Sequence, residues 1–158
     1  MKLIIVSDTH LRVERLIHRI SEIENVDMIL HLGDMVRDAN TIAKRLGKKV
    51  IEVKGNCDMT GDKIPITRQL IWQNKKILMT HGHEYNVKTS LNRLFYKALE
   101  SQPDIVLFGH THMPMQETLG GILFLNPGSA TYPREFRMPS FGVLDYINGE
   151  IVTDIITF

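Results

Sequence analysis

The sequence has 158 residues, of which 43% are hydrophobic and 23% are charged, a size and composition typical of one globular domain. Its 19 Lys and Arg residues are balanced by 18 Asp and Glu residues, and the formal net charge of +1 argues against a nucleic-acid-binding surface or a polybasic membrane-binding segment. Cys57 is the single cysteine, which excludes an internal disulfide. We expect one domain over residues 1–158, because no linker, repeat or low-complexity tract divides the chain.

The first apolar run covers residues 3–6 and is followed directly by Ser7 and Asp8. A secretion signal or a membrane span needs a longer apolar segment than this. We therefore expect a cytoplasmic protein with no membrane partner.

The N-terminal part of the chain alternates between predicted strands and predicted helices. Short apolar runs predict buried strands over residues 3–6, 28–32 and 50–53, and apolar residues at helical spacing predict helices over residues 11–23 and through residues 42–46. We expect Asp38 or Asn40 to cap the second helix at its N-terminus and Gly47 to end it. This order of elements predicts right-handed crossovers and a parallel sheet.

The remainder of the chain is dominated by predicted hairpins. The predicted elements are strands over residues 64–72 and 76–79 around a tight turn at 73–75, a helix over residues 87–98 that ends before Pro103, a strand over residues 104–108, and hairpins over residues 115–125 and 141–156. The sheets should therefore be mixed, parallel at first and antiparallel later. Packing two sheets together with helices outside would bury the apolar faces of both halves.

Five predicted strands end in clusters of glycine, histidine and acidic or amide residues. The clusters are Asp8-Thr9-His10, Gly33-Asp34, Gly55-Asn56-Cys57-Asp58, His81-Gly82-His83 and Gly109-His110-Thr111-His112. Turns favour Asp, Asn and Gly on propensity alone, but they do not favour His. Ligands of open α/β sheets bind at the carboxyl ends of strands, so we expect these clusters to meet at one edge.

The side chains in these clusters match a metal site. Carboxylate oxygens and imidazole nitrogens are good ligands for Mn²⁺, Fe²⁺, Zn²⁺, Ni²⁺ and Co²⁺. An Asp-x-His or His-x-His spacing puts both side chains on one face if the backbone is extended, and neighbouring glycines allow close approach of the backbone. The candidates are too many for one tetrahedral ion and suit two ions that share one carboxylate. The candidate ligands are Asp8, His10, Asp34, Asn56, His81, His110 and His112.

These five clusters, in this order across the whole chain, resemble the calcineurin-like metallophosphoesterases. The short length, the Gly55-Asn56-Cys57-Asp58 run and the Asn126-Pro127-Gly128-Ser129 run are most similar to the small YfcE-type phosphodiesterases. The resemblance implies a four-layer α/β/β/α sandwich with mixed sheets. It also implies that Asp8, His10 and His112 hold one metal ion, that Asn56, His81 and His110 hold the other, and that Asp34 bridges the two.

The resemblance further implies a phosphodiesterase that depends on two divalent metal ions, with Mn²⁺ preferred and Ni²⁺, Fe²⁺, Zn²⁺ or Co²⁺ as alternatives. A hydroxide that bridges the metals would attack the phosphate ester of a small phosphodiester or nucleotide. Asn56, Asp34 and His81 are the residues expected to act in catalysis. The oligomeric state, including a homo-oligomer, stays open.

Two departures from the family pattern restrict the range of substrates that we expect. Larger members carry His directly after the ligand Asn, where it assists the leaving group, and this chain has Cys57 there. Because a thiol is a poor acid near neutral pH, esters with good leaving groups such as aryl phosphodiesters should be favoured. The Asp-Arg-Gly run of protein Ser/Thr phosphatases is absent from residues 33–38, which argues against a phosphoprotein substrate.

Several polar residues have simpler interpretations. A hydrogen-bonded core position is expected for His31, a solvated helix surface for His18, and a solvated loop for Arg134 and Arg137. Either a structural role or a role beside the ligands or substrate fits His83.

Two other functions compete with the enzyme. A retromer subunit resembles the same small fold but has lost part of the ligand set, so a non-catalytic interaction scaffold is the alternative. A nuclease of the same superfamily would need extra DNA-binding regions, for which this chain has neither the length nor the charge.

Overall fold

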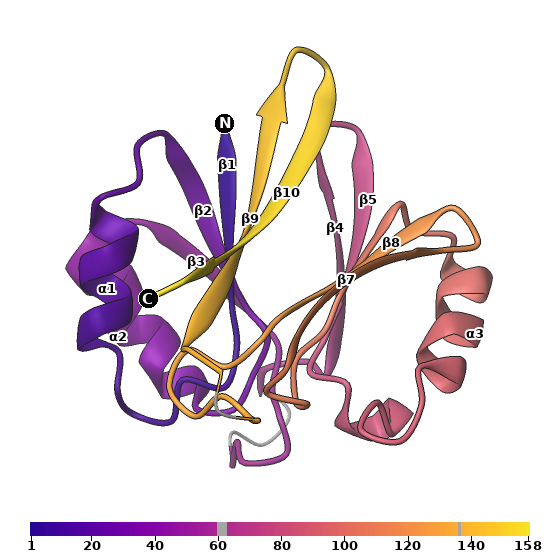
Figure 1. The fold of residues 1–158 in the computed structure, drawn as a ribbon, viewed down its shortest axis with the longest axis horizontal. Helices are drawn as coiled ribbons and strands as arrows, with labels where there is room; N and C mark the ends of the chain where they lie inside the picture. The colour runs from indigo at the N-terminus through magenta and orange to yellow at the C-terminus, as the bar shows by residue number, and fades with distance from the viewer. Residues whose placement is uncertain (60–62, 136) are drawn as a thin grey trace.

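The computed structural model describes residues 1–59, 63–135 and 137–158. It contains two five-stranded mixed sheets that face each other, with two helices outside one sheet and one helix outside the other (Figure 1). The four-layer α/β/β/α sandwich expected from the sequence is confirmed.

The first sheet has the strand order β10-β9-β1-β2-β3. Its strands are β1 (Lys2–Val6), β2 (Val26–His31), β3 (Lys49–Glu52), β9 (Ser140–Ile147) and β10 (Glu150–Thr157). The strands β1, β2 and β3 are parallel, as the alternation of strands and helices predicts, whereas β9 runs antiparallel to both β1 and β10.

The second sheet has the strand order β4-β5-β6-β8-β7. Its strands are β4 (Thr67–Trp72), β5 (Lys75–Thr80), β6 (Ile105–Leu107), β7 (Pro114–Leu119) and β8 (Ile122–Pro127). The three central strands are parallel, and the edge strands β4 and β7 are antiparallel to their neighbours.

Three apolar layers hold the sandwich together. One lies between the sheets and includes Leu30, Met79 and Leu125. A second packs the helices α1 (Glu14–Ser21) and α2 (Val36–Leu46) on the first sheet, and a third packs α3 (Asn92–Ser101) on the second sheet. Each layer removes apolar surface from water, the main favourable contribution to folding.

Helix boundaries differ from the sequence prediction in instructive ways. Helix α1 is shorter than expected, because the segment after β1 forms turns that present His10 and Leu11 before the helix begins. Helix α2 begins at Val36, so neither Asp38 nor Asn40 is its N-cap, whereas Gly47 does end it in the left-handed conformation. The strand predicted from residue 64 begins at Thr67.

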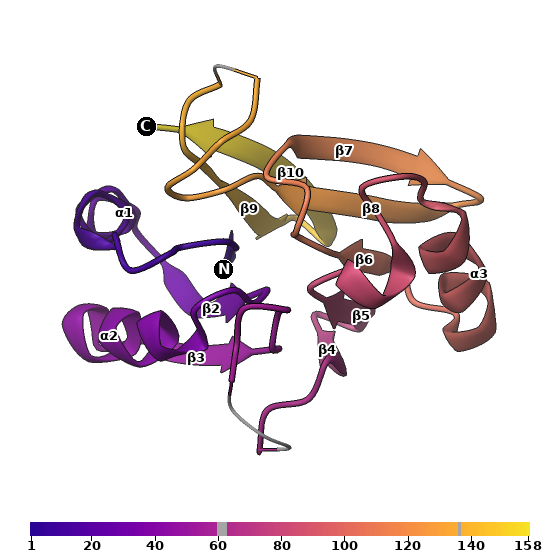
Figure 2. The same ribbon diagram turned by 90° about the horizontal axis from the view of Figure 1, so that it is seen from below.

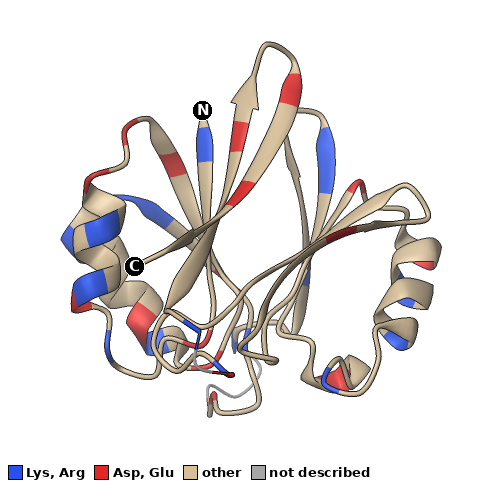
Figure 3. Cartoon of the chain, viewed as in Figure 1, with Lys and Arg blue, Asp and Glu red and all other residues tan. Residues whose placement is uncertain are grey.

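The carboxyl ends of β1, β2, β3, β5 and β6 all lie at one edge of the sandwich. Figure 2 looks onto this edge, where the loops of both sheets come together. Figure 3 shows that Lys and Arg as well as Asp and Glu are present along it. None of the described helices is long and apolar enough to cross a membrane.

Candidate metal centre

The two sheets contribute to the site almost equally. From the first sheet, Asp8 and His10 follow β1, Asp34 follows β2 and Asn56 follows β3. The candidates from the second sheet follow the ends of β5 and β6, and these are His81, His110 and His112. The site therefore lies at the seam where the loops of the two sheets meet.

Six of the seven candidates form two groups that share one residue. The first group is Asp8, His10, Asp34 and His112, and the second is Asp34, His81 and His110. Within each group the ligand atoms lie within 4.8 Å of one another. Sequence reasoning alone required one shared carboxylate, and Asp34 is the residue that belongs to both groups.

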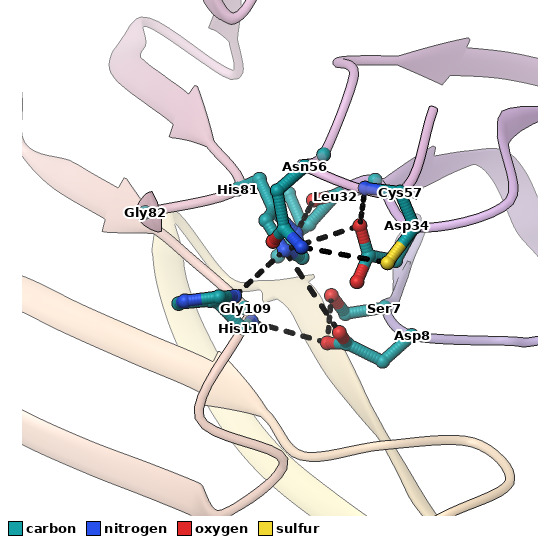
Figure 4. A network of polar contacts seen from close by, with 12 residues as sticks. Ser7, Asp8, Leu32, Asp34, Asn56, Cys57, His81, Gly82, Gly109 and His110 are labelled. Atoms are coloured by element: carbon teal, nitrogen blue, oxygen red, sulfur yellow. Dashed lines mark hydrogen bonds and ion pairs between the residues drawn. The ribbon is translucent and has the colours of Figure 1, made fainter. Parts of the chain in front are cut away.

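Asn56 is the seventh candidate, and its side chain is exposed. It extends toward His81 and Asp34 in Figure 4, on the side of the second group. Its amide nitrogen lies 3.4 Å from Sγ of the neighbouring Cys57. The structure thus brings Asn56 to the edge of the cluster rather than into its buried part.

The backbone at the ligands differs from the extended conformation that the spacing suggested. Asp8, His10, Asp34, His110 and His112 all have positive φ, between 41° and 68°. Non-glycine residues rarely adopt this left-handed conformation, and such strain concentrates at functional sites. Left-handed turns, and not extended strands, direct Asp8 and His10, and likewise His110 and His112, toward the candidate metal centre.

Asp8 is fully buried and receives several hydrogen bonds. Its Oδ2 accepts one from the Ser7 hydroxyl at 2.6 Å and one from the backbone N–H of His110 at 3.1 Å. Its Oδ1 lies 3.0 Å from Nε2 of His112. Burial alone would raise the pKa of Asp8, but the contact with His112 and the charges of His81 and His112 outweigh it and lower the pKa to about 2.

Two histidines are held in one tautomer by backbone carbonyl groups. Nδ1 of His81 lies 2.8 Å from the carbonyl oxygen of Leu32, and Nδ1 of His112 lies 2.7 Å from that of Tyr132. Because a carbonyl oxygen only accepts hydrogen bonds, each Nδ1 carries the proton. In the neutral rings, the lone pair of Nε2 then faces the cluster, an arrangement common for histidines that bind metal ions.

When both rings are neutral, these lone pairs point at carboxylate oxygens and at a further imidazole nitrogen, an arrangement that suits a cation. Nε2 of His81 lies 3.1 Å from Nδ1 of His110 and 3.4 Å from Oδ1 of Asp34. Among the described residues, Oδ1 of Asp8 and Nε2 of His10 are buried without a well-aligned hydrogen-bond partner. Buried polar atoms without a partner are costly, and a divalent cation bound by the carboxylates and imidazoles would satisfy them, so the residues present fit divalent cations.

The protonation of the outer histidines follows their surroundings. Burial, aided by the charge of His81, lowers the pKa of His110 to about 4. Burial would also lower the pKa of His112, but its contact with Asp8 dominates and raises it. A proton on His112 and a metal ion beside Asp8 thus compete for the same acceptor atoms.

The loop after β3 donates a hydrogen bond to the carboxylate of Asp34. The backbone N–H of Cys57 donates to Oδ1 of Asp34 at 2.9 Å (Figure 4). Burial and the neighbouring carboxylate of Asp34 raise the pKa of the Cys57 thiol to about 11. At neutral pH the thiol is therefore protonated, and its contribution to the site is the backbone N–H.

Glycines next to the ligands permit the close approach expected from the sequence. A Cβ on Gly55 would collide with the carboxylate of Asp34, and a Cβ on Gly109 would collide with the hydroxyl of Ser7 and lie 3.1 Å from Oδ2 of Asp8. Both positions therefore require a residue without a side chain.

The remaining predicted residues have clear positions. His31 is fully buried and hydrogen-bonded, as expected, and His18 is exposed beside Glu22. The ring of His83 lies 5.4 Å from that of His81, its Nδ1 is buried without a described partner, and burial lowers its pKa. Arg134 is exposed, as expected for a loop, but its N–H donates to the carbonyl of His112.

The run of residues 126–129 lies beside the site. The amide of Asn126 donates to the carbonyl of Gly109, and the hydroxyl of Ser129 donates to the carbonyl of Asp8. These two bonds fix the backbone that carries Asp8 and His110.

Two carboxylates support the site, and sequence reasoning missed the role of one of them, Asp38. Asp38 is buried and accepts hydrogen bonds from the Thr9 hydroxyl at 2.6 Å and from the N–H of Leu11 at 2.8 Å. Asp58 accepts from the N–H groups of Met35, Val36 and Gly55, each at 2.8 Å. The proximity of Asp58 to Asn56 in sequence left either a supporting role or a turn for Asp58, and two of its three partners, Met35 and Val36, are distant along the chain.

Comparison with known proteins identifies the family. The model of the calcineurin-like phosphoesterase superfamily domain matches residues 1–149, and the chain belongs to this superfamily. The probable metallophosphoesterase YsnB of Bacillus subtilis is 37% identical over 150 residues, which cover 94% of this chain and 86% of YsnB. Phosphodiesterase YfcE of Escherichia coli is 35% identical over 116 residues, which cover 66% of this chain but only 58% of YfcE.

Solved structures agree with the fold. A predicted phosphoesterase from Streptococcus pneumoniae superposes with a TM-score of 0.83 at 29% identity, covering 99% of this chain and 88% of that one. Zinc-bound Vps29 of Entamoeba histolytica superposes with a TM-score of 0.78 at 24% identity, covering 99% of both chains, a likeness that shows the fold alone.

Proposed function

We propose that this chain is a phosphodiesterase that depends on two divalent metal ions and hydrolyses a small phosphodiester or a nucleotide. Membership of the superfamily and the similarity to a named phosphodiesterase support this activity. The observation that carries the proposal is the pair of ligand groups that share Asp34. A cytoplasmic location and Mn²⁺ as the preferred ion, with Ni²⁺, Fe²⁺, Zn²⁺ or Co²⁺ as alternatives, belong to the same proposal.

The residues of the site suit phosphate-ester hydrolysis by water. Bound divalent cations would polarise the phosphoryl group and lower the pKa of a coordinated water. Asp8, His10 and His112 would hold one cation, Asn56, His81 and His110 the other, and Asp34 would contact both. The N–H of Cys57 keeps Asp34 oriented, and the amide of Asn56 is available to the phosphoryl oxygens.

Cys57 limits the range of leaving groups in this proposal. A thiol gives up a proton far less readily than an imidazolium near neutral pH. Diesters whose leaving group needs no protonation, such as aryl esters, should therefore react fastest. Replacing Cys57→His should raise the rate for an alkyl diester more than for an aryl diester, and equal effects on both would contradict this role of the position.

The activity is tested with chelator-treated protein and defined metals. Bis(p-nitrophenyl) phosphate and p-nitrophenyl phosphate are assayed with each of the five metals, and we expect metal-dependent hydrolysis that favours the diester. Asp34→Asn should lower kcat/KM by about 10²-fold or more. Asp27→Asn changes an exposed carboxylate on β2 and serves as the matched control.

A non-catalytic interaction scaffold is the alternative function. Vps29 structures share the fold, but at 24% identity or below they say nothing about activity. The complete candidate ligand set favours the enzyme. Purified protein that takes up no metal by elemental analysis and hydrolyses neither ester would favour the scaffold instead.

A further inference from the structure

A pocket of about 350 Å³ lies beside the candidate metal centre, between the start of α1, the loop after β8 and Phe158. Its apolar lining comes from Leu11, Ala130, Pro139 and Phe158. Its polar lining is Arg12, Glu14, Arg15 and Thr131. The volume is at the lower end of the range for small-molecule sites.

The two arginines give this pocket a net positive charge. Glu14 is the only acidic residue of the lining, and both of its oxygens accept hydrogen bonds from Arg45 at 3.1 Å. Among the described residues, neither Arg12 nor Arg15 forms an ion pair. Their donors are therefore available to an anion, and the planar guanidinium group suits a phosphate.

Both arginines are also placed by aromatic rings. The guanidinium carbon of Arg12 lies 5.3 Å from the centre of the Tyr132 ring, and that of Arg15 lies 5.8 Å from the centre of the Phe158 ring. Such cation–π contacts restrict long side chains that would otherwise be mobile. An apolar floor with two oriented guanidinium groups is suited to an organic group that carries a negative charge.

Direct contacts connect the pocket to the metal ligands. The Tyr132 ring lies 5.6 Å from the ring of His10, so this one ring separates Arg12 from a candidate ligand. The carbonyl of Tyr132 also contacts His112. The Thr131 hydroxyl donates to the carbonyl of Thr9 at 2.7 Å, which ties the pocket wall to the segment between Asp8 and His10.

We propose that this pocket, with Arg12 and Arg15, binds a second phosphate of the substrate while the reacting phosphodiester occupies the metal centre. The proposal rests on the proposed function and names its substrate class, which is phosphodiesters that carry a further phosphate on the same small molecule. A nucleoside with one esterified phosphate and one free phosphate has this chemistry.

Kinetics on two matched diesters test the proposal. The substrates are the p-nitrophenyl ester of thymidine 5′-phosphate and the same ester with an added 3′-phosphate. In the wild type, the 3′-phosphate should lower KM about tenfold, the effect expected for one or two charge-assisted hydrogen bonds. Arg12→Gln and Arg15→Gln should each reduce this preference, and the double variant should bring the two kcat/KM values to within about twofold.

Arg93→Gln is the matched control, because Arg93 is an exposed arginine on α3 at the opposite side of the molecule. It should retain both the activity and the preference of the wild type. Equal kcat/KM for the two esters in the wild type, or an unchanged preference in the double variant, would overturn the proposal.

A binding measurement separates this proposal from the proposed function. Calorimetry on the full chain saturated with Mn²⁺ compares thymidine 3′,5′-bisphosphate with thymidine 5′-monophosphate. We expect the bisphosphate to bind about tenfold tighter, and the double variant to lose the difference. This result supports the pocket even if neither ester is hydrolysed, whereas equal binding of the two nucleotides to the wild type contradicts it whatever the activity.

Discussion

Behind the metal ligands, the two ring nitrogens of His31 have different partners. Nδ1 accepts a hydrogen bond from the N–H of Gly33 at 3.2 Å, so the proton is on Nε2, which lies 3.2 Å from the Thr9 hydroxyl. That hydroxyl in turn donates to Asp38. The chain of bonds connects the loop that carries Asp34 to the loop that carries Asp8, and it requires a neutral imidazole.

The stability of the metal-free protein should depend on the protonation of His31. Burial lowers the pKa of His31 from 6.5 to about 4. Between these pH values the unfolded chain binds a proton that the folded chain does not, so the free energy of unfolding falls as the pH falls from 6.5 to 4. The full loss for this residue is about 3 kcal/mol.

The comparison of wild type with His31→Gln isolates this contribution, because Gln can accept from Gly33 and donate to Thr9 without titrating. Urea unfolding between pH 7 and pH 4 should show the wild type losing about 3 kcal/mol more than the variant. Parallel pH profiles of the two proteins would contradict a buried, neutral His31.

Asp58 connects the loop after β3 to the start of α2. Its carboxylate accepts the first N–H groups of α2 and also the N–H of Gly55. Asp58→Ala would leave these donors without a partner, and we expect a loss of about 2–3 kcal/mol in the free energy of unfolding. Urea unfolding measures it, with Asp27→Ala as an exposed control that should change stability by about 0.5 kcal/mol or less. A loss for Asp58→Ala no larger than that of the control would exclude the capping role.

At the scale of elements, buried strands and hairpin turns were predictable from local pattern. The apolar run before Asp8 and the Asn148-Gly149 turn each carry their information within a few residues. The N-terminal cap of α2 was not predictable in this way. Asp38 accepts hydrogen bonds from Thr9 and Leu11 instead, and the carboxylate of Asp58, from another loop, caps the helix. Propensity cannot anticipate a partner that arrives from a distant segment.

In the candidate site, too, some features follow from local sequence and others depend on distant segments. Residue type and position after strands predicted which side chains meet, and the structure brings them together. The left-handed backbone at Asp8, His10, His110 and His112 was not predictable, since each residue alone disfavours it and only the surrounding hydrogen bonds hold it. The grouping around Asp34 likewise depends on how the two sheets face each other.

The loop after β6 should tolerate no side chain at Gly109. In Gly109→Ala the new methyl group would displace Ser7 or Asp8, because both contact that position. We expect metal affinity to fall about tenfold or more, and stability by about 1–3 kcal/mol. Gly149→Ala is the control, since nothing lies within 4 Å of its Cβ position and only its positive φ is strained. Metal titration and urea unfolding give the two readouts, and an unchanged metal affinity in Gly109→Ala would contradict the close approach.

At the scale of the whole molecule, the candidate ligands join two sheets that otherwise meet through an apolar interface. Asp34 belongs to the first sheet, while His81 and His110 belong to the second, and these three form one ligand group. Across this interface, Nε2 of His81 lies 3.4 Å from Oδ1 of Asp34, and a cation between the two sheets would bind both atoms. The folded state should therefore gain stability from metal binding at the point where the two sheets separate on unfolding.

Metal should consequently raise the melting temperature. At a free metal concentration of about 100 times Kd, binding to the folded state alone adds about 2.7 kcal/mol, which corresponds to a rise of roughly 5–11 °C for a domain of this size. Asp34→Asn weakens both ligand groups at once and should lose most of the rise, whereas Asp27→Asn should keep it. Thermal unfolding of chelator-treated protein across a Mn²⁺ titration measures the effect. A melting temperature that does not respond to any of the five metals, or an equal rise in Asp34→Asn, would show that no cation links the two sheets.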